Sequence, residues 1–171
     1  MQHYGIPTRL LDWSENLFVA AYFALAQCDP TDKSSRPTVW CLNPVRWNRS
    51  MPALSEYGET VRVLTTADEE AECYRPETNR KRQKSPVAIF GTHNSQRIVA
   101  QRGTFTVWGS DTRSMERYTE DLQEPVLWQI ALDAPRADLF ASLQRLGFSE
   151  TMVFPELSYL AEELKRLEGW R

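Results

Sequence analysis

The chain has 171 residues, of which 42% are hydrophobic and 25% are charged, and its formal net charge is -3. The length is that of one ordinary domain, and the composition supports a buried core and argues against global disorder. The small negative charge gives no general attraction to nucleic acid or to acidic membranes.

The first half of the chain predicts one apolar helix followed by short strands. Nearly every residue from 17 to 26 is apolar, which indicates a helix that is covered on most sides. Asp12 or Ser14 is expected to cap this helix, and Asp12 and Glu15 have the spacing of a capping box. Further along we expect strands at 38–42 and 86–90, an acidic helical segment at 68–74 and a basic loop at 75–84.

The second half predicts two more strands and three helices. Asn94 is expected to cap a short helix that stops at Gly103, and residues 111–124 are expected to form a loop. Strands are expected at 104–108 and 126–132, and amphipathic helices at 135–146 and 155–168. The apolar stripes of these two helices are Leu139, Phe140, Leu143 and Leu146, and Leu157, Leu160, Ala161, Leu164 and Leu167. Because strands and helices do not alternate regularly, the sequence predicts an α+β fold: a single domain with a small mixed or antiparallel sheet.

The cysteine and histidine content predicts neither a metal site nor a disulfide framework. The three cysteines are widely spaced, no CxxC pair occurs, and only two histidines are present. We therefore expect reduced cysteines and a cytoplasmic protein. No signal peptide is recognised at Met1, and no apolar run is long enough to span a bilayer, so no membrane partner is expected.

The opening segment, His3 to Trp13 followed by Ala21 to Ala24, resembles the FRG domain family. Residues 94–105 and 146–157 resemble it too, so the resemblance covers nearly the whole chain. Leu17 departs from the family, which often has Pro after Asn at this point. The Phe/Tyr-Arg-Gly motif that names the family, and that would precede this segment, is absent. We therefore expect one FRG-like domain over residues 1–171 that lacks its first strand.

The layout of the FRG family is similar to that of ADP-ribosyltransferases. Those enzymes place an Arg or His on an early strand, an aromatic residue on a following helix, and an acidic or amide residue on a late strand. This similarity implies NAD or a related nucleotide as the substrate, and ADP-ribosyl transfer or NAD cleavage as the chemistry.

The opening segment offers four candidate site residues. His3 and Tyr4 could hold a ribose or stack on a nicotinamide ring; alternatively, His3 caps a turn and Tyr4 packs in the core. Arg9 could clamp a pyrophosphate through its bidentate fork, or form an ion pair with Asp12. Asp12 could act as a general base, although its position favours helix capping.

Three further candidates lie after Trp13. Gln101 could orient a ribose hydroxyl, as the late carboxylate of the transferases does, or make a hydrogen bond at a helix C-terminus. Arg97 could contact a phosphate or form a surface ion pair. Tyr22 is expected to pack beside the ligand, with core packing as the simpler interpretation.

The basic run at 80–84 could contact nucleic-acid phosphates. A solvated loop is favoured instead, because no aromatic residues interleave with the charges. No dinucleotide-binding glycine fingerprint, P-loop, zincin or hydrolase nucleophile motif occurs, which argues against those four kinds of activity.

These observations lead to three hypotheses. The first is an FRG-type domain that binds NAD or another nucleotide, with no other cofactor, in which Gln101, His3 and Arg9 are catalytic and line one cleft. The second is a non-catalytic module that contacts a protein partner, with the opening segment as a structural corner. The third is nucleic-acid binding through residues 75–84. In the first hypothesis the ligand-binding residues are Tyr4, Asp12, Tyr22 and Arg97.

Overall fold

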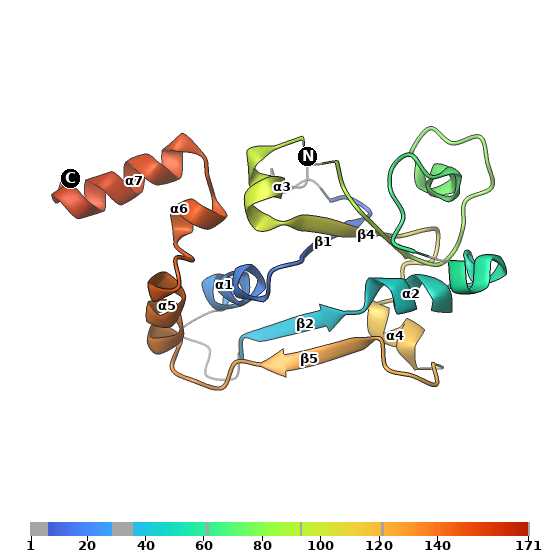
Figure 1. Cartoon of the computed structure of the whole chain (residues 1–171), viewed down its shortest axis with the longest axis horizontal. Coiled ribbons are helices and arrows are strands. Elements are labelled where there is room, and N and C mark those ends of the chain that lie inside the picture. Colours follow the sequence, from blue (N-terminus) through green and yellow to red (C-terminus); the bar gives the residue numbers. More distant parts are fainter. Residues whose placement is uncertain (1–6, 29–35, 61, 93, 121, 171) are drawn as a thin grey trace. The chain divides into compact units, whose positions relative to one another are not determined.

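The computed structural model describes residues 7–28, 36–60, 62–92, 94–120 and 122–170. The fold is α+β, as predicted, with small antiparallel sheets and several short helices (Figure 1). The chain divides into two compact units and passes between them repeatedly. The first unit comprises Met1–Trp13, Trp40–Thr92 and Thr104–Trp128, and the second comprises Ser14–Val39, His93–Gly103 and Gln129–Arg171.

One sheet has three strands, in the order β1-β4-β3. At one end of the β1–β4 pair the Trp108 N–H donates to the Arg9 carbonyl at 2.8 Å, and at the other the Glu15 N–H donates to the Arg102 carbonyl at 3.1 Å. These two bonds fix an antiparallel pairing. β3 is also antiparallel to β4, with Val87 opposite Val107. The strands span Leu10–Ser14 (β1), Val87–Ile89 (β3) and Gly103–Val107 (β4).

The second sheet pairs β2 (Thr38–Leu42) with β5 (Leu127–Ala131). The Asn43 N–H donates to the Val126 carbonyl and the Leu132 N–H donates to the Pro37 carbonyl, each at 2.9 Å. The two strands therefore run antiparallel, as their arrows show in Figure 1. Both strands lie where the sequence predicts them, at 38–42 and within 126–132.

The core of the first unit forms around helix α2 (Pro44–Ser50). Asn43 caps this helix, and Trp47 is fully buried, with its indole N–H donating to the Pro86 carbonyl at 3.3 Å. The prediction of a loop over 111–124 is wrong in part, because helix α4 (Met115–Thr119) forms there. This helix is stabilised by Met115, which is buried in the same core as Trp47. Two 3₁₀ segments, η2 (Ser55–Thr60) and η3 (Glu69–Tyr74), complete the unit, the second at the predicted acidic segment.

Asn48 is fully buried and joins α2 to β3 through backbone groups. Its amide nitrogen donates to the carbonyls of Ala88 and Arg62, both at 2.9 Å, and its amide oxygen accepts the Ala88 N–H at 2.7 Å. The side chain thus pairs polar backbone groups that would otherwise be buried without partners.

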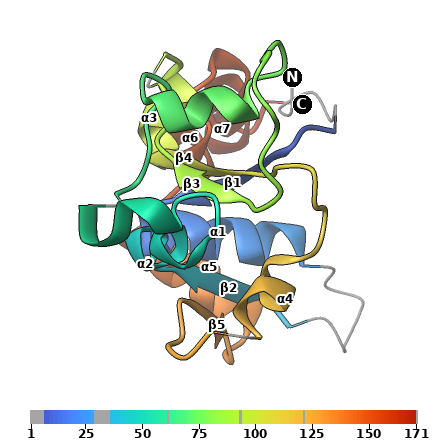
Figure 2. The same cartoon turned by 90° about the vertical axis from the view of Figure 1, so that its right-hand side faces the viewer.

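The second unit is mostly helical, and α1 packs against α5 (Figures 1 and 2). Its core consists of Tyr22, Leu25, Leu143 and Val153, surrounded by aromatic side chains. The helices are α1 (Leu17–Gln27), α3 (Gln96–Gln101), α5 (Arg136–Arg145), α6 (Glu150–Val153) and α7 (Leu157–Glu168).

Two predicted helix caps are wrong by one to a few residues. Asn16, not Asp12 or Ser14, caps α1, and its side-chain oxygen accepts the Phe18 N–H at 2.9 Å. The reason is that strand β1 continues to Ser14, so the helix cannot begin earlier. Ser95, not Asn94, caps α3, and the helix ends at Arg102 in a left-handed conformation with φ 47°. Gly103 is therefore free to begin β4.

The last predicted helix forms as α7, although its leucines lie on the surface, and α6 is a further helix that the sequence did not predict. The short α6 precedes α7, and Leu157 and Leu167 of α7 are 81% and 75% exposed. On α5 the predicted stripe packs in the core at Leu139, Phe140 and Leu143, whereas Leu146 is exposed. Within the described ranges, none of the helices has the length and apolar character needed to cross a membrane.

Substitution of Asn48 by alanine should lower the free energy of unfolding by about 3 kcal/mol, because the buried Ala88 N–H and carbonyl and the partly buried Arg62 carbonyl lose their partner. Urea unfolding followed by tryptophan fluorescence measures this. Ser55→Ala is the control, since its hydroxyl donates to the Pro52 carbonyl on the exposed surface. Similar losses in the two variants would contradict the role given to Asn48.

Candidate functional site

Arg9 lies just before β1 in the first unit, where two backbone carbonyls hold its guanidinium. Nη1 donates to the Trp108 carbonyl at 3.1 Å and Nη2 donates to the Tyr74 carbonyl at 2.6 Å. Trp108 follows the end of β4 and Tyr74 ends η3, so the side chain joins three segments of the first unit. Contacts of this geometry hold a long side chain in one orientation.

Tyr74 also joins the two ends of the predicted basic loop at 75–84. The side chain is 5% exposed, and its hydroxyl donates to the Ser85 carbonyl at 2.9 Å. Burial raises the pKa of the Tyr74 hydroxyl, so this group stays a hydrogen-bond donor. Residues 75–84 therefore begin and end beside Tyr74, and Arg9 lies at the start of the loop. The loop is part of the green stretch at the upper right of Figure 1.

The loop is exposed and rich in unneutralised cations. Arg75 pairs with Glu72 at 2.9 Å. Among the described residues, no carboxylate pairs with Arg9 or with the four cations of the second half of the loop. Burial lowers the pKa of Arg9, and the nearby charge of Arg82 lowers it further. Those four cations are Arg80, Lys81, Arg82 and Lys84.

The predicted ion pair between Arg9 and Asp12 does not form. Asp12 lies within β1, is exposed and does not cap α1. Side chains alternate between the two faces of a strand, so residues three positions apart point to opposite faces. His3 and Tyr4 lie outside the described residues, and their roles remain predictions.

Three other candidates meet in the second unit, around Phe154. Arg97 lies over the Phe154 ring, 4.6 Å from its centroid. Tyr22 packs edge-on against the same ring, with centroids 6.2 Å apart. Gln101 donates its amide N–H to the carbonyl of Val153 at 3.0 Å. Phe154 lies in one of the segments that resemble the FRG family, but nothing in the sequence indicated its central position.

The chemistry available around Phe154 is limited by contacts within the unit. Arg97 also forms an ion pair with Glu156 at 3.5 Å. Burial raises the pKa of Tyr22, and the nearby charge of Glu150 raises it further, so its hydroxyl stays neutral. This cluster is a packed junction between α1, α3 and the segment after α6.

The structure thus groups the candidates by unit. Arg9 and Asp12 belong to the first unit, and Tyr22, Arg97 and Gln101 belong to the second. That His3, Arg9 and Gln101 line one cleft stays a prediction. The sequence did not indicate Tyr74 and Trp108. Both hold Arg9 through backbone carbonyls, and every residue type has such a carbonyl.

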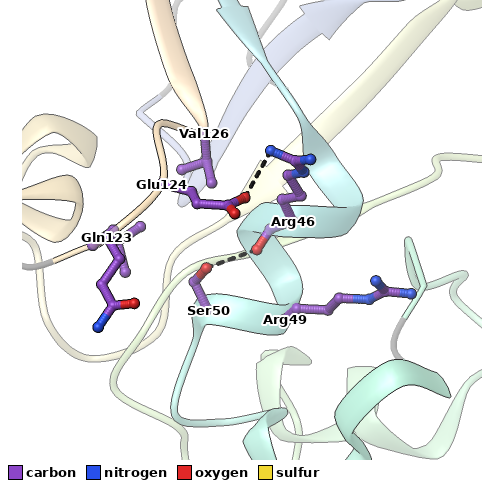
Figure 3. A pocket seen from close by; sticks show the side chains of 7 residues that line it. Arg46, Arg49, Ser50, Gln123, Glu124 and Val126 are labelled. Carbon is purple, nitrogen blue, oxygen red and sulfur yellow. Dashed lines mark hydrogen bonds and ion pairs between the residues drawn. The ribbon is translucent and has the colours of Figure 1, made fainter.

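An open depression of about 390 Å³ lies on the first unit between α2 and residues 122–126 (Figure 3). Its charged groups already have partners: Arg46 pairs with Glu124 and Arg49 with Glu59, both at 2.9 Å. Figure 3 shows Arg49 pointing away from Ser50 and Gln123. This mixed lining favours no single class of ligand. The lining residues are Arg46, Arg49, Ser50, Leu122, Gln123, Glu124 and Val126.

No metal centre is visible in the part of the chain that the structure describes. Within it, no group of three or more His, Cys, Asp or Glu side chains is placed to hold a metal ion.

Comparison with known proteins bears on the opening segment. The model of the FRG domain matches residues 1–33, which include Arg9, Asp12 and Tyr22. Searches of curated proteins and of solved structures found no match to the chain. The match does not extend to ADP-ribosyltransferases. It confirms the resemblance predicted from His3–Trp13 and Ala21–Ala24: the opening segment of this chain is similar to part of the FRG domain.

Proposed function

We propose that this FRG-type domain binds a nucleotide, NAD or a related one, and that Arg9 holds its phosphates. The observation that supports this is that the Arg9 guanidinium is held in place but its charge is not balanced within the part of the chain that the structure describes. Backbone carbonyls orient it, and no carboxylate among the described residues neutralises it. Arginine is the residue best suited to planar, bidentate recognition of phosphate oxygens.

Arg9 also keeps hydrogen-bonding capacity for a ligand. A guanidinium has five N–H groups. Two of them donate to Trp108 and Tyr74, and the other three have no partner among the described residues. Because Arg9 is half-buried, a phosphate oxygen bound there would be partly shielded from water, which strengthens a charge-assisted hydrogen bond.

Transfer of ADP-ribose or cleavage of NAD would be a further step. It needs a group that orients the ribose as positive charge develops at its anomeric carbon. In Gln101 the amide nitrogen is already bound to the Val153 carbonyl, so its side-chain oxygen is the atom that would accept a ribose hydroxyl. Binding is the part of the proposal that the contacts of Arg9 support.

Calorimetry with NAD and with ADP-ribose tests the binding. Arg9→Lys keeps the charge but loses the planar fork, and should weaken binding about tenfold or more. Arg117→Gln is the control, because Arg117 is an exposed arginine of the same unit that pairs with Glu120. A folded wild-type chain that binds neither compound at millimolar concentration would contradict the proposal.

A second candidate function is a non-catalytic module that contacts a protein partner. The packing of Tyr22, Arg97 and Gln101 around Phe154 favours it, since each of these side chains has a structural contact. In this alternative the three residues stabilise the second unit and contact no ligand.

Gln101→Ala separates these alternatives. If Gln101 is structural, the variant should lose about 1 kcal/mol of stability, seen as a lower melting temperature, with NAD binding unchanged. Gln144→Ala, at an exposed position of α5, is the control and should melt like the wild type. An unchanged melting temperature with weakened NAD binding would instead support a ligand-binding role for Gln101.

A further inference from the structure

Arg9 and Arg82 donate to carbonyls of one short backbone stretch. Arg9 Nη2 donates to the Tyr74 carbonyl at 2.6 Å, and Arg82 Nη2 donates to the Pro76 carbonyl at 3.1 Å. Residues two positions apart are separated by at most about 7 Å along the backbone. The two guanidinium groups are therefore neighbours, although they lie far apart in the sequence.

The backbone that directly follows Arg82 is fixed by hydrogen bonds. The Ser110 N–H donates to the Gln83 carbonyl at 3.0 Å, and the Asp111 N–H donates to the Lys84 carbonyl at 3.1 Å. Gly109 lies so close that a Cβ there would collide with both of these carbonyl oxygens. The end of the loop is therefore held beside the residues that follow β4, where the Trp108 carbonyl accepts a hydrogen bond from Arg9.

The two cations lack an internal counter-charge. Arg75, which lies between Tyr74 and Pro76 in the chain, pairs with Glu72 and donates to the Thr66 carbonyl. Neither Arg9 nor Arg82 has a carboxylate partner among the described residues. Two like charges held together without an anion repel each other, and a bound anion relieves that repulsion. The charge of Arg82 lowers the pKa of Arg9, as this proximity requires.

We propose that Arg9 and Arg82 together form a clamp for a diphosphate group, in which each guanidinium binds one phosphate. This rests on the proposed nucleotide binding and adds Arg82 as its second arm. The charges match, because a diphosphate diester such as that of NAD carries one negative charge on each phosphate. Each planar fork can bind two oxygens of one phosphate.

The surroundings favour a compact ligand over a long nucleic acid. Glu69, Glu70 and Glu72 lie on η3, which leads directly into the loop, and Arg80 reaches back to the Glu69 carbonyl at 3.5 Å. A phosphate chain that extended past the clamp would meet these carboxylates. A diphosphate is short enough to stay between the two arginines.

Calorimetry of the whole chain with inorganic pyrophosphate tests the clamp. Arg82→Gln should weaken pyrophosphate and ADP-ribose binding about tenfold or more, because one charge-assisted contact is lost. Lys81→Gln removes the same charge from the adjacent exposed position and should change binding less than about threefold. Arg82 is exposed, so its variant should melt like the wild type without ligand. Pyrophosphate should raise the melting temperature of the wild type and of Lys81→Gln, and raise that of Arg82→Gln much less.

Several results would overturn the clamp. They are equal losses in Arg82→Gln and Lys81→Gln, orthophosphate binding as tight as pyrophosphate, and tighter binding of a single-stranded oligonucleotide. If Arg9→Lys weakens NAD binding while Arg82→Gln does not, the clamp fails and nucleotide binding stands. If pyrophosphate binding depends on both arginines while NAD does not bind, the clamp stands and nucleotide binding fails.

Discussion

The buried hydroxyl of Tyr74 is the constraint on which the candidate site depends. A phenol in an apolar core must find an acceptor, and the carbonyl of Ser85 is the one it finds. That bond brings together the two ends of residues 75–84, which have no regular secondary structure. The core that surrounds Tyr74, with Leu64, Val87 and Val107, offsets the entropy lost in closing such a loop. The carbonyl of Tyr74 is then in place for Arg9.

The segment that matches the FRG family contributes to both compact units. Its first part supplies Arg9 and strand β1 to the first unit, and its second part supplies α1, with Tyr22, to the second. Trp13 marks the boundary: it packs on the first unit's core, and its indole N–H donates to the Thr106 hydroxyl at 2.7 Å. Residues so close in sequence therefore serve different cores, and nearness in the chain is a poor guide to shared chemistry here.

The sequence predicted the elements whose pattern is local. The apolar run at 17–26 and the strand-forming run at 38–42 each depend on side chains within one element, and both elements formed there. Helix α4 was missed because Met115 and Tyr118 are few apolar residues in a polar stretch, and only the core around Trp47 stabilises them. The cap of α1 was misplaced because strand pairing, a long-range effect, decided where β1 ends.

The candidate site was predictable only in its residue types. Arg9 was identified because a guanidinium suits phosphate, and that argument needs no coordinates. Its contacts with Trp108 and Tyr74, and its proximity to Arg82, depend on carbonyl groups that every residue has. The basic loop was interpreted as a solvated surface because no aromatic residues interleave with its charges. A charge run alone does not show which of its members has a fixed neighbour.

An acidic chain can nevertheless hold a specific anion site. The net charge of -3 acts at long range, where salt screens it beyond about 8 Å under physiological conditions. Within that distance Arg9 and Arg82 determine the local electrostatic potential, and no acidic residue of the described chain neutralises them. A long polyanion interacts with charges over the whole surface, including the carboxylates of η3. A diphosphate interacts mainly with the two guanidinium groups. The same charge distribution that disfavours nucleic acid therefore permits a small phosphate ligand, and the size of the ligand becomes the basis of its selection.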